Sequence, residues 1–155
     1  MVKYKIIDTD DSCISLLYKH LSVQSLLDMK AVNGEVTENV LKDLRDMSLK
    51  SKTVYYDNKL AYVIFVIPTT ENECSLFIVS STLGYAFKDT LQETFENIIK
   101  DLPNCYFYSI VYKGNHQYAK LLKDNGFKQI KEMIHGVEKR NFILLGKEKN
   151  GKGRA

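Results

Sequence analysis

Residues 80–127 read SSTLGYAFKDTLQETFENIIKDLPNCYFYSIVYKGNHQYAKLLKDNGF, and this stretch decides the fold. After the loop of residues 81–86, apolar side chains recur at the spacing of one helical face. These side chains are Phe87, Leu91, Phe95, Ile98, Ile99 and Leu102. Residues 105–111 then predict a strand, and a further helix opens at Asn115 and closes at Gly126. With the apolar run that ends at Ser80, the order is strand, helix, strand, helix.

The residues before this stretch predict a strand, two helices and a β-hairpin. The strand covers residues 4–7. Asp10-Asp11-Ser12 offers an N-cap for the first helix, which Ser22 can restart and which Asn33-Gly34 ends. Thr37 caps the second helix. Residues 53–56 and 60–67 flank Asp57-Asn58-Lys59, a hairpin signal.

Pro68 is expected to stop the second arm of the hairpin, because proline has no N–H for the strand ladder. Glu71-Asn72-Glu73 predicts a turn, residues 74–80 the next strand, and residues 129–134 and 142–145 the last two. The full order is β-α-α-β-β-β-α-β-α-β-β. We therefore expect an α+β fold with a mixed, mostly antiparallel sheet.

Composition is that of one globular domain. The chain has 155 residues, of which 45% are hydrophobic and 26% charged. Its longest apolar run, residues 60–67, is far shorter than the ~20 residues that cross a bilayer. The first residues do not resemble a signal peptide. We expect the protein in the cytosol, or in an assembly formed there.

The cysteines and histidines do not indicate a metal site. Cys13, Cys74 and Cys105 are widely spaced in apolar contexts, which favours buried free thiols. The three histidines are not spaced like metal ligands, so no metal is expected.

The net charge of +3 resides in the C-terminal segment. Residues 147–155 carry Lys147, Lys149, Lys152 and Arg154 against Glu148, which leaves residues 1–146, the expected domain, neutral overall. A neutral body argues against nucleic-acid binding. Ordering such a glycine-rich tail costs ~1–2 kcal/mol of backbone entropy per residue. We therefore expect contacts with another protein chain to hold it.

The element order resembles the GNAT acyltransferase superfamily from Tyr4 to about Gly146. In that family the loop Gln/Arg-x-x-Gly-x-Gly/Ala binds the coenzyme A phosphates through its backbone N–H groups. The loop here, residues 81–86, has Gly84 and Ala86 in place, with Ser81 at the Gln/Arg position and the bulky Tyr85. The resemblance implies an acetyl-CoA cleft between the strand ending near Val79 and the strand from Cys105, parallel neighbours that part beyond Ser80.

The helix after the second strand carries a further resemblance. Its Asn115 and its ending Leu-x-x-x-Gly-Phe are similar to the family's pattern, in which the Asn caps the helix and contacts the pantetheine arm. The family's general acid, a Tyr seven residues after that Asn, is replaced by Leu122. Tyr118 lies on the same face and is the candidate acid, with a core tyrosine as the alternative. The candidate bases Glu71 and Glu73 fit a solvated turn better.

The chain also resembles the short GNAT-like proteins of tailed-phage virions. Shared features are Asp8 to Asp11, Ser51 before the hairpin, a poorly conforming phosphate loop, and the segments VYKGN and LLKDNGF. Two functions stay open. One is a non-catalytic virion or assembly protein with a degenerate acyl-CoA site, indicated by Ser81 and Leu122. The other is an acetyl-CoA-dependent N-acetyltransferase acting on a small amine or a protein amino group, indicated by Gly84, Ala86 and Asn115.

Overall fold

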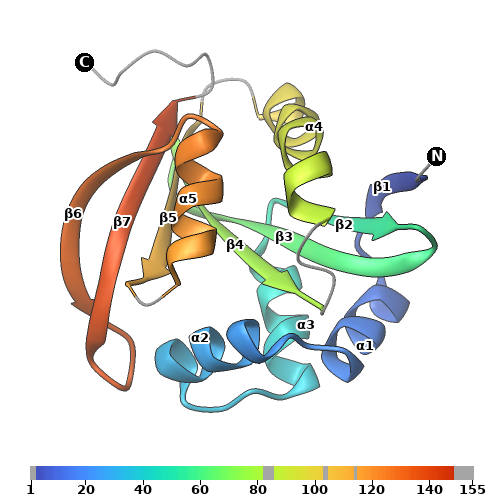
Figure 1. Cartoon of the computed structure of the whole chain (residues 1–155), viewed down its shortest axis with the longest axis horizontal. Coiled ribbons are helices and arrows are strands. Elements are labelled where there is room, and N and C mark those ends of the chain that lie inside the picture. The colour runs from blue at the N-terminus through green and yellow to red at the C-terminus, as the bar shows by residue number, and fades with distance from the viewer. Residues whose placement is uncertain (1–2, 82–85, 103–104, 114, 149–155) are drawn as a thin grey trace.

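A computed structural model describes residues 3–81, 86–102, 105–113 and 115–148 of the chain. Within this part, seven strands form one sheet in the order β1-β2-β3-β4-β5-β7-β6 (Figure 1). The strands are β1 (Tyr4–Asp8), β2 (Lys50–Tyr56), β3 (Lys59–Thr70), β4 (Glu73–Ser80), β5 (Tyr106–Tyr112), β6 (Lys128–His135) and β7 (Arg140–Glu148). Among the described strands, β4 and β5 are parallel neighbours and the other pairs are antiparallel. The expected α+β class and mostly antiparallel sheet are confirmed.

Helices cover both faces of the sheet. In the described residues they are α1 (Asp11–Lys19), α2 (Val23–Asn33), α3 (Glu38–Met47), α4 (Ala86–Asp101) and α5 (His116–Asp124). Figure 1 places α4 and α5 on one side and α1, α2 and α3 on the other. None of the described helices is long and apolar enough to cross a membrane.

The core has one apolar cluster on each face, and β3 supplies both. Tyr62 and Ile64 face α4 and α5, whereas Val63 and Phe65 face α1, α2 and α3. All four side chains are fully buried. A strand covered on both faces needs a continuous apolar run instead of an alternating one, and residues 60–67 have it.

Several local predictions are confirmed at the level of single hydrogen bonds. The side chains of Asp10, Ser22 and Thr37 accept bonds from backbone N–H groups at the starts of α1, α2 and α3. Asp57 and Asn58 have positive φ, as the hairpin turn between β2 and β3 requires. On α4, Leu91, Phe95 and Ile98 are buried against the sheet as predicted.

One prediction about an element boundary is wrong, and one expected helix is divided in two. The restart expected at Ser22 begins a separate helix, α2, because the chain breaks at residues 20–22. Pro68 does not end its strand, since β3 continues to Thr70. The pairing with β2 ends at Val66, so Pro68 has β4 as its one neighbour, beside a register shift. A proline is tolerated in such a position because no second ladder needs its N–H.

The strands β4 and β5 separate early. Three residue pairs join them, from Glu73↔Tyr106 to Ser75↔Tyr108, and beyond these pairs the strands diverge (Figure 1). The expected parallel pair and its splay are confirmed, with the splay beginning at Ser75 instead of beyond Ser80. The result is a V-shaped opening in the middle of the sheet.

The C-terminal tail expected over residues 147–155 is described only in its first two residues. Lys147 and Glu148 are the last residues of β7, paired with Phe107 and Tyr106 of β5. Residues 149–155 lie outside the described part of the chain. The division into a domain and a tail that binds another chain stays a prediction.

Candidate functional site

A cleft of about 260 Å³ lies beside the V between β4 and β5. Its walls come from the first two turns of α2, the end of β4 and the first half of α5. The described residues that line it are Ser22, Gln24, Ser25, Asp28, Ile78, Ser80, Ser81, Asn115, Gln117, Tyr118 and Leu121. Ser25, Asp28, Ile78 and Tyr118 also line a small cavity of about 20 Å³ further inside, which reaches Ser109 of β5. The splay of the sheet therefore opens onto a polar cleft.

Tyr118 projects from α5 into the V. Its hydroxyl lies 3.4 Å from Ser109 Oγ on β5, and the backbone of Ile78 on β4 also hydrogen-bonds it. Burial raises the pKa of Tyr118 well above its ordinary value, with Asp28 adding a smaller electrostatic contribution in the same direction. The phenol therefore keeps its proton at neutral pH. It can donate a hydrogen bond to a group in the cleft, but it is a poor source of a free proton.

Asn115 connects α5 to α2. Its side-chain oxygen accepts the N–H of Tyr118 (3.2 Å) and so caps α5, while its Nδ2 donates to Asp28 Oδ2 (3.0 Å). The other oxygen of Asp28 accepts Gln24 Nε2 at 2.8 Å, one turn earlier on α2. Burial raises the pKa of Asp28, and the hydrogen bonds from Gln24 and Asn115 partly offset this rise. The carboxyl group is thus held in a fixed orientation at the cleft wall.

Three serines tie the start of α2 to the end of β4. The Ser80 backbone N–H donates to Ser25 Oγ (2.9 Å), and its carbonyl accepts the N–H of Ser22 (2.9 Å). Ser80 Oγ also lies 2.9 Å from Ser22 Oγ and 3.1 Å from Ser25 Oγ. Four residues before Ser80, the carbonyl of Leu76 accepts the Ser109 hydroxyl at 3.0 Å. Side chains and α2 therefore satisfy backbone groups of β4 that β5 no longer reaches.

The opposite end of α2 is fastened to the turn between β6 and β7. The N–H groups of Val137 and Glu138 donate to the carbonyls of Val32 and Ala31, at 3.1 and 3.2 Å. Gly136 has φ +79°, and a Cβ there would lie 2.5 Å from the Ala31 carbonyl oxygen. Helix α2 consequently spans the V, attached to β4 at its start, to α5 at Asp28 and to the hairpin at its end.

The structure brings together some of the site residues expected from sequence. Asn115, Tyr118 and Ser81 all line the cleft. The Ser81 hydroxyl, however, donates to the carbonyl of Leu60 (2.8 Å) and is buried against β3. Gly84 and Tyr85 lie outside the described residues; Ala86 is the first residue of α4. Whether these positions bind a cofactor stays a prediction.

The other positions considered for catalysis lie elsewhere. Leu122, at the family's general-acid position, is fully buried in the core. Glu71 lies in the turn before β4 and Glu73 begins that strand, at the end opposite the cleft. The sequence did not indicate that Asp28, Ser22, Ser25 and Ser109 lie at this site. The one local sign of it was the four-residue spacing of Gln24 and Asp28, which puts the two side chains on the same face of a helix. Among the described residues, no cluster of three or more His, Cys, Asp or Glu side chains could hold a metal ion.

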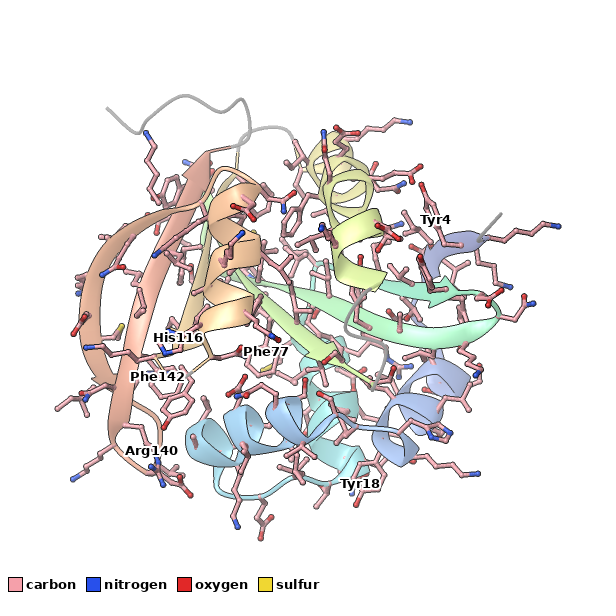
Figure 2. The ribbon with its side chains drawn as sticks, viewed as in Figure 1. Tyr4, Tyr18, Phe77, His116, Arg140 and Phe142 are labelled. Atoms are coloured by element: carbon pink, nitrogen blue, oxygen red, sulfur yellow. The ribbon has the colours of Figure 1, made fainter. Side chains whose placement is uncertain are left out.

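A second hollow lies on the surface near the starts of α5 and β7. It is lined by Tyr112, Lys113, His116, Glu138, Lys139, Arg140 and Asn141. Figure 2 shows His116, Arg140 and Phe142 gathered in this region, whereas Phe77 lies between β4 and α2. The hollow is more open than the cleft, and its charged groups include ion pairs such as Arg140 with Glu138 (3.0 Å). It shares no lining residue with the cleft.

Comparison with known proteins gives a structural match without a sequence match. No family model matches the chain, and no curated protein sequence matches it. Ard1 from Thermoplasma volcanium is 13% identical over 94% of this chain and 97% of its own, with a TM-score of 0.74. A Vibrio cholerae spermidine N-acetyltransferase, solved with CoA and spermine, is 12% identical over 96% of each chain, with a TM-score of 0.75.

The ribosomal-protein-S18-alanine N-acetyltransferase from Escherichia coli is 13% identical over 98% of this chain and 97% of its own, with a TM-score of 0.70. At such identities the likeness concerns the fold. The chain has the fold of the GNAT N-acetyltransferases, as its sequence motifs led us to expect.

Proposed function

We propose that this protein is an acyl-CoA-dependent N-acyltransferase, with acetyl-CoA as the expected acyl donor. The proposal rests on one observation. Strands β4 and β5 diverge beside a polar cleft, and the Tyr118 side chain lines that cleft. Two of the structural neighbours named above are N-acetyltransferases, and one of these was solved with CoA and spermine. The pantetheine arm would lie along β4 near Ile78 and Ser80.

The chain's own residues supply three elements of such a reaction. The cleft would hold donor and acceptor side by side, and correct placement alone supplies much of the rate of amine attack on a thioester. Tyr118, protonated at neutral pH, would donate a hydrogen bond to the leaving sulfur. Asn115 fixes the start of α5 and therefore the position of Tyr118.

The test is acetyl-CoA binding, measured as a thermal shift and by calorimetry. Ligand at 100 times its dissociation constant should stabilise the fold by ~2.7 kcal/mol. Leu121→Trp, which fills the cleft, should abolish the shift. Lys120→Trp, at the neighbouring exposed position, should keep it. No shift at millimolar acetyl-CoA would overturn the proposal.

A second candidate is a non-catalytic assembly protein, such as the virion proteins that the sequence resembles. Two observations favour it: the Ser80 backbone groups that face the V are already bonded to α2, and the Ser81 hydroxyl is turned into the sheet. Val23 and Leu27 also leave apolar surface exposed on α2, at 75% and 54% of their areas. Such a protein would bind its partners without acyl-CoA.

The second candidate predicts that the C-terminal tail binds a partner chain. A truncation should begin after Glu148, because Lys147 and Glu148 pair with β5. Removing residues 149–155 should leave the melting temperature unchanged and weaken incorporation into the assembly. Normal incorporation of the truncated chain would remove this support.

A further inference from the structure

The cleft carries one negative charge and no positive one among its described lining residues. Asp28 is the single carboxylate, and no Lys, Arg or His lines the walls. The neighbouring residues outside the described part, 82–85 and 114, are uncharged in the sequence. A ligand in this cleft therefore meets a potential that favours cations.

In the part of the chain that the structure describes, no cationic group neutralises Asp28. Its two oxygens accept bonds from two neutral amides, Gln24 Nε2 and Asn115 Nδ2, and it takes part in none of the ion pairs among the described residues. A carboxylate has about four acceptor positions, so two stay available. A half-buried carboxylate without a cationic partner lowers the stability of the fold, because it has lost part of its hydration. A bound cation would offset this loss.

Asp28 lies close to Tyr118, since its charge contributes to the raised pKa of that phenol. It lines both the outer cleft and the inner cavity, as do Ile78 and Tyr118. A group bound to Asp28 is therefore next to the Tyr118 hydroxyl, at the point where the V opens.

We propose that the cleft binds a cationic primary amine as its acyl acceptor and that Asp28 is the residue that selects it. The ammonium group would donate to the two free acceptor positions of Asp28, with the amine's chain in the outer cleft. The transfer step rests on the proposed acyltransferase function, but the ammonium site does not.

The proton balance is consistent with this role. The bound ammonium gives one proton to Asp28 or to water, so that an N–H bond breaks and the electron pair stays on nitrogen. Burial, which raises the pKa of Asp28, makes its carboxylate a better proton acceptor than an exposed one. Transfer then forms a C–N bond and breaks the C–S bond, and the second proton of the amine passes to the sulfur.

The experiment is a nuclear magnetic resonance titration of the full chain with n-butylamine, in the absence of acyl-CoA. We expect saturable shifts in the side-chain amides of Asn115 and Gln24. n-Butanol, which has the same length and no charge, should produce none. Asp28→Asn should weaken n-butylamine binding at least tenfold, and Asp124→Asn, an exposed acid on α5, should not change it.

Stability separates this role from a structural one. Asp28→Asn removes a half-buried charge that has no cationic partner among the described residues, so its melting temperature at pH 7 should equal or exceed that of the wild type. Equal binding of n-butylamine and n-butanol, or undiminished amine binding by Asp28→Asn, would overturn the inference. Amine binding without any acetyl-CoA binding would preserve the site and overturn the acyltransferase.

Discussion

The Tyr118 hydroxyl is a polar group that contacts both diverging strands, and its removal tests how much these contacts stabilise the fold. Tyr118→Phe leaves the backbone group of Ile78 without its partner in a buried place. We expect a loss of ~1–3 kcal/mol in the free energy of unfolding, measured in urea. Tyr18→Phe, at an exposed position on α1, should stay within about 0.5 kcal/mol of wild type. A loss for Tyr118→Phe no larger than that control would contradict the role of this hydroxyl.

A second prediction at the residue scale concerns Asp10, the N-cap of α1. Hydrogen bonds from the Ser12 hydroxyl and the Cys13 N–H lower its pKa from 3.8 to about 2. A carboxyl whose pKa is lowered by folding stabilises the protein above pH 3.8, and the contribution is lost as pH falls toward 2. Asp10→Asn keeps a capping oxygen, but its melting temperature should fall less than that of the wild type between pH 4 and pH 2. Ser12→Ala should show a smaller effect in the same direction. A fall equal to that of the wild type in both variants would contradict the assignment.

At the scale of elements, the joint between α2 and the β6–β7 turn depends on a close backbone approach at Gly136. Alanine at this position would be unfavourable for two reasons. Its backbone would have to keep the left-handed conformation, and its Cβ would lie 2.5 Å from the Ala31 carbonyl oxygen of α2. Gly34→Ala is a matched control, with φ +78° and a Cβ that meets only the Val137 side chain at 3.2 Å. Left-handed backbone costs both variants ~1–2 kcal/mol. Gly136→Ala should lower the melting temperature clearly more than Gly34→Ala does. Equal decreases would show that α2 and the β6–β7 turn can move apart at little cost in stability.

Elements were predictable where their signals are local. The caps of α1, α2 and α3, the Asp57-Asn58 turn and the α4 stripe each depend on residues within one or two turns of chain. The extension of β3 past Pro68 was not predictable, because it depends on where the neighbouring strand ends. The same holds for the cleft. Asp28 meets Asn115 across 87 positions and Ser25 meets Ser80 across 55, and no spacing in the sequence records such pairs.

At the scale of the whole molecule, α2 occupies the edge of β4 along which a pantetheine arm would pair. The free protein should therefore bind acyl-CoA only after this contact loosens, which reduces the apparent affinity. Ser25→Ala removes the partner of the Ser80 N–H. We expect a lower melting temperature together with tighter acetyl-CoA binding in calorimetry. Affinity that falls along with stability would show that α2 builds the donor site instead of obstructing it.

The three residue pairs between β4 and β5 also bear on how the chain is assembled during synthesis. Strands β1 to β4 pair with one another in an antiparallel meander, and they are complete by Ser80. The second block, β5 to β7, pairs internally through a late hairpin, and in the described residues its strand ladder with the first block has just those three pairs. A ribosome delivers the first block, with α1, α2 and α3, before any residue of the second leaves the exit tunnel. Until β5 arrives, the nascent chain has an unpaired strand edge at Glu73 to Ser75 of β4, and such an edge is a template for pairing with another chain.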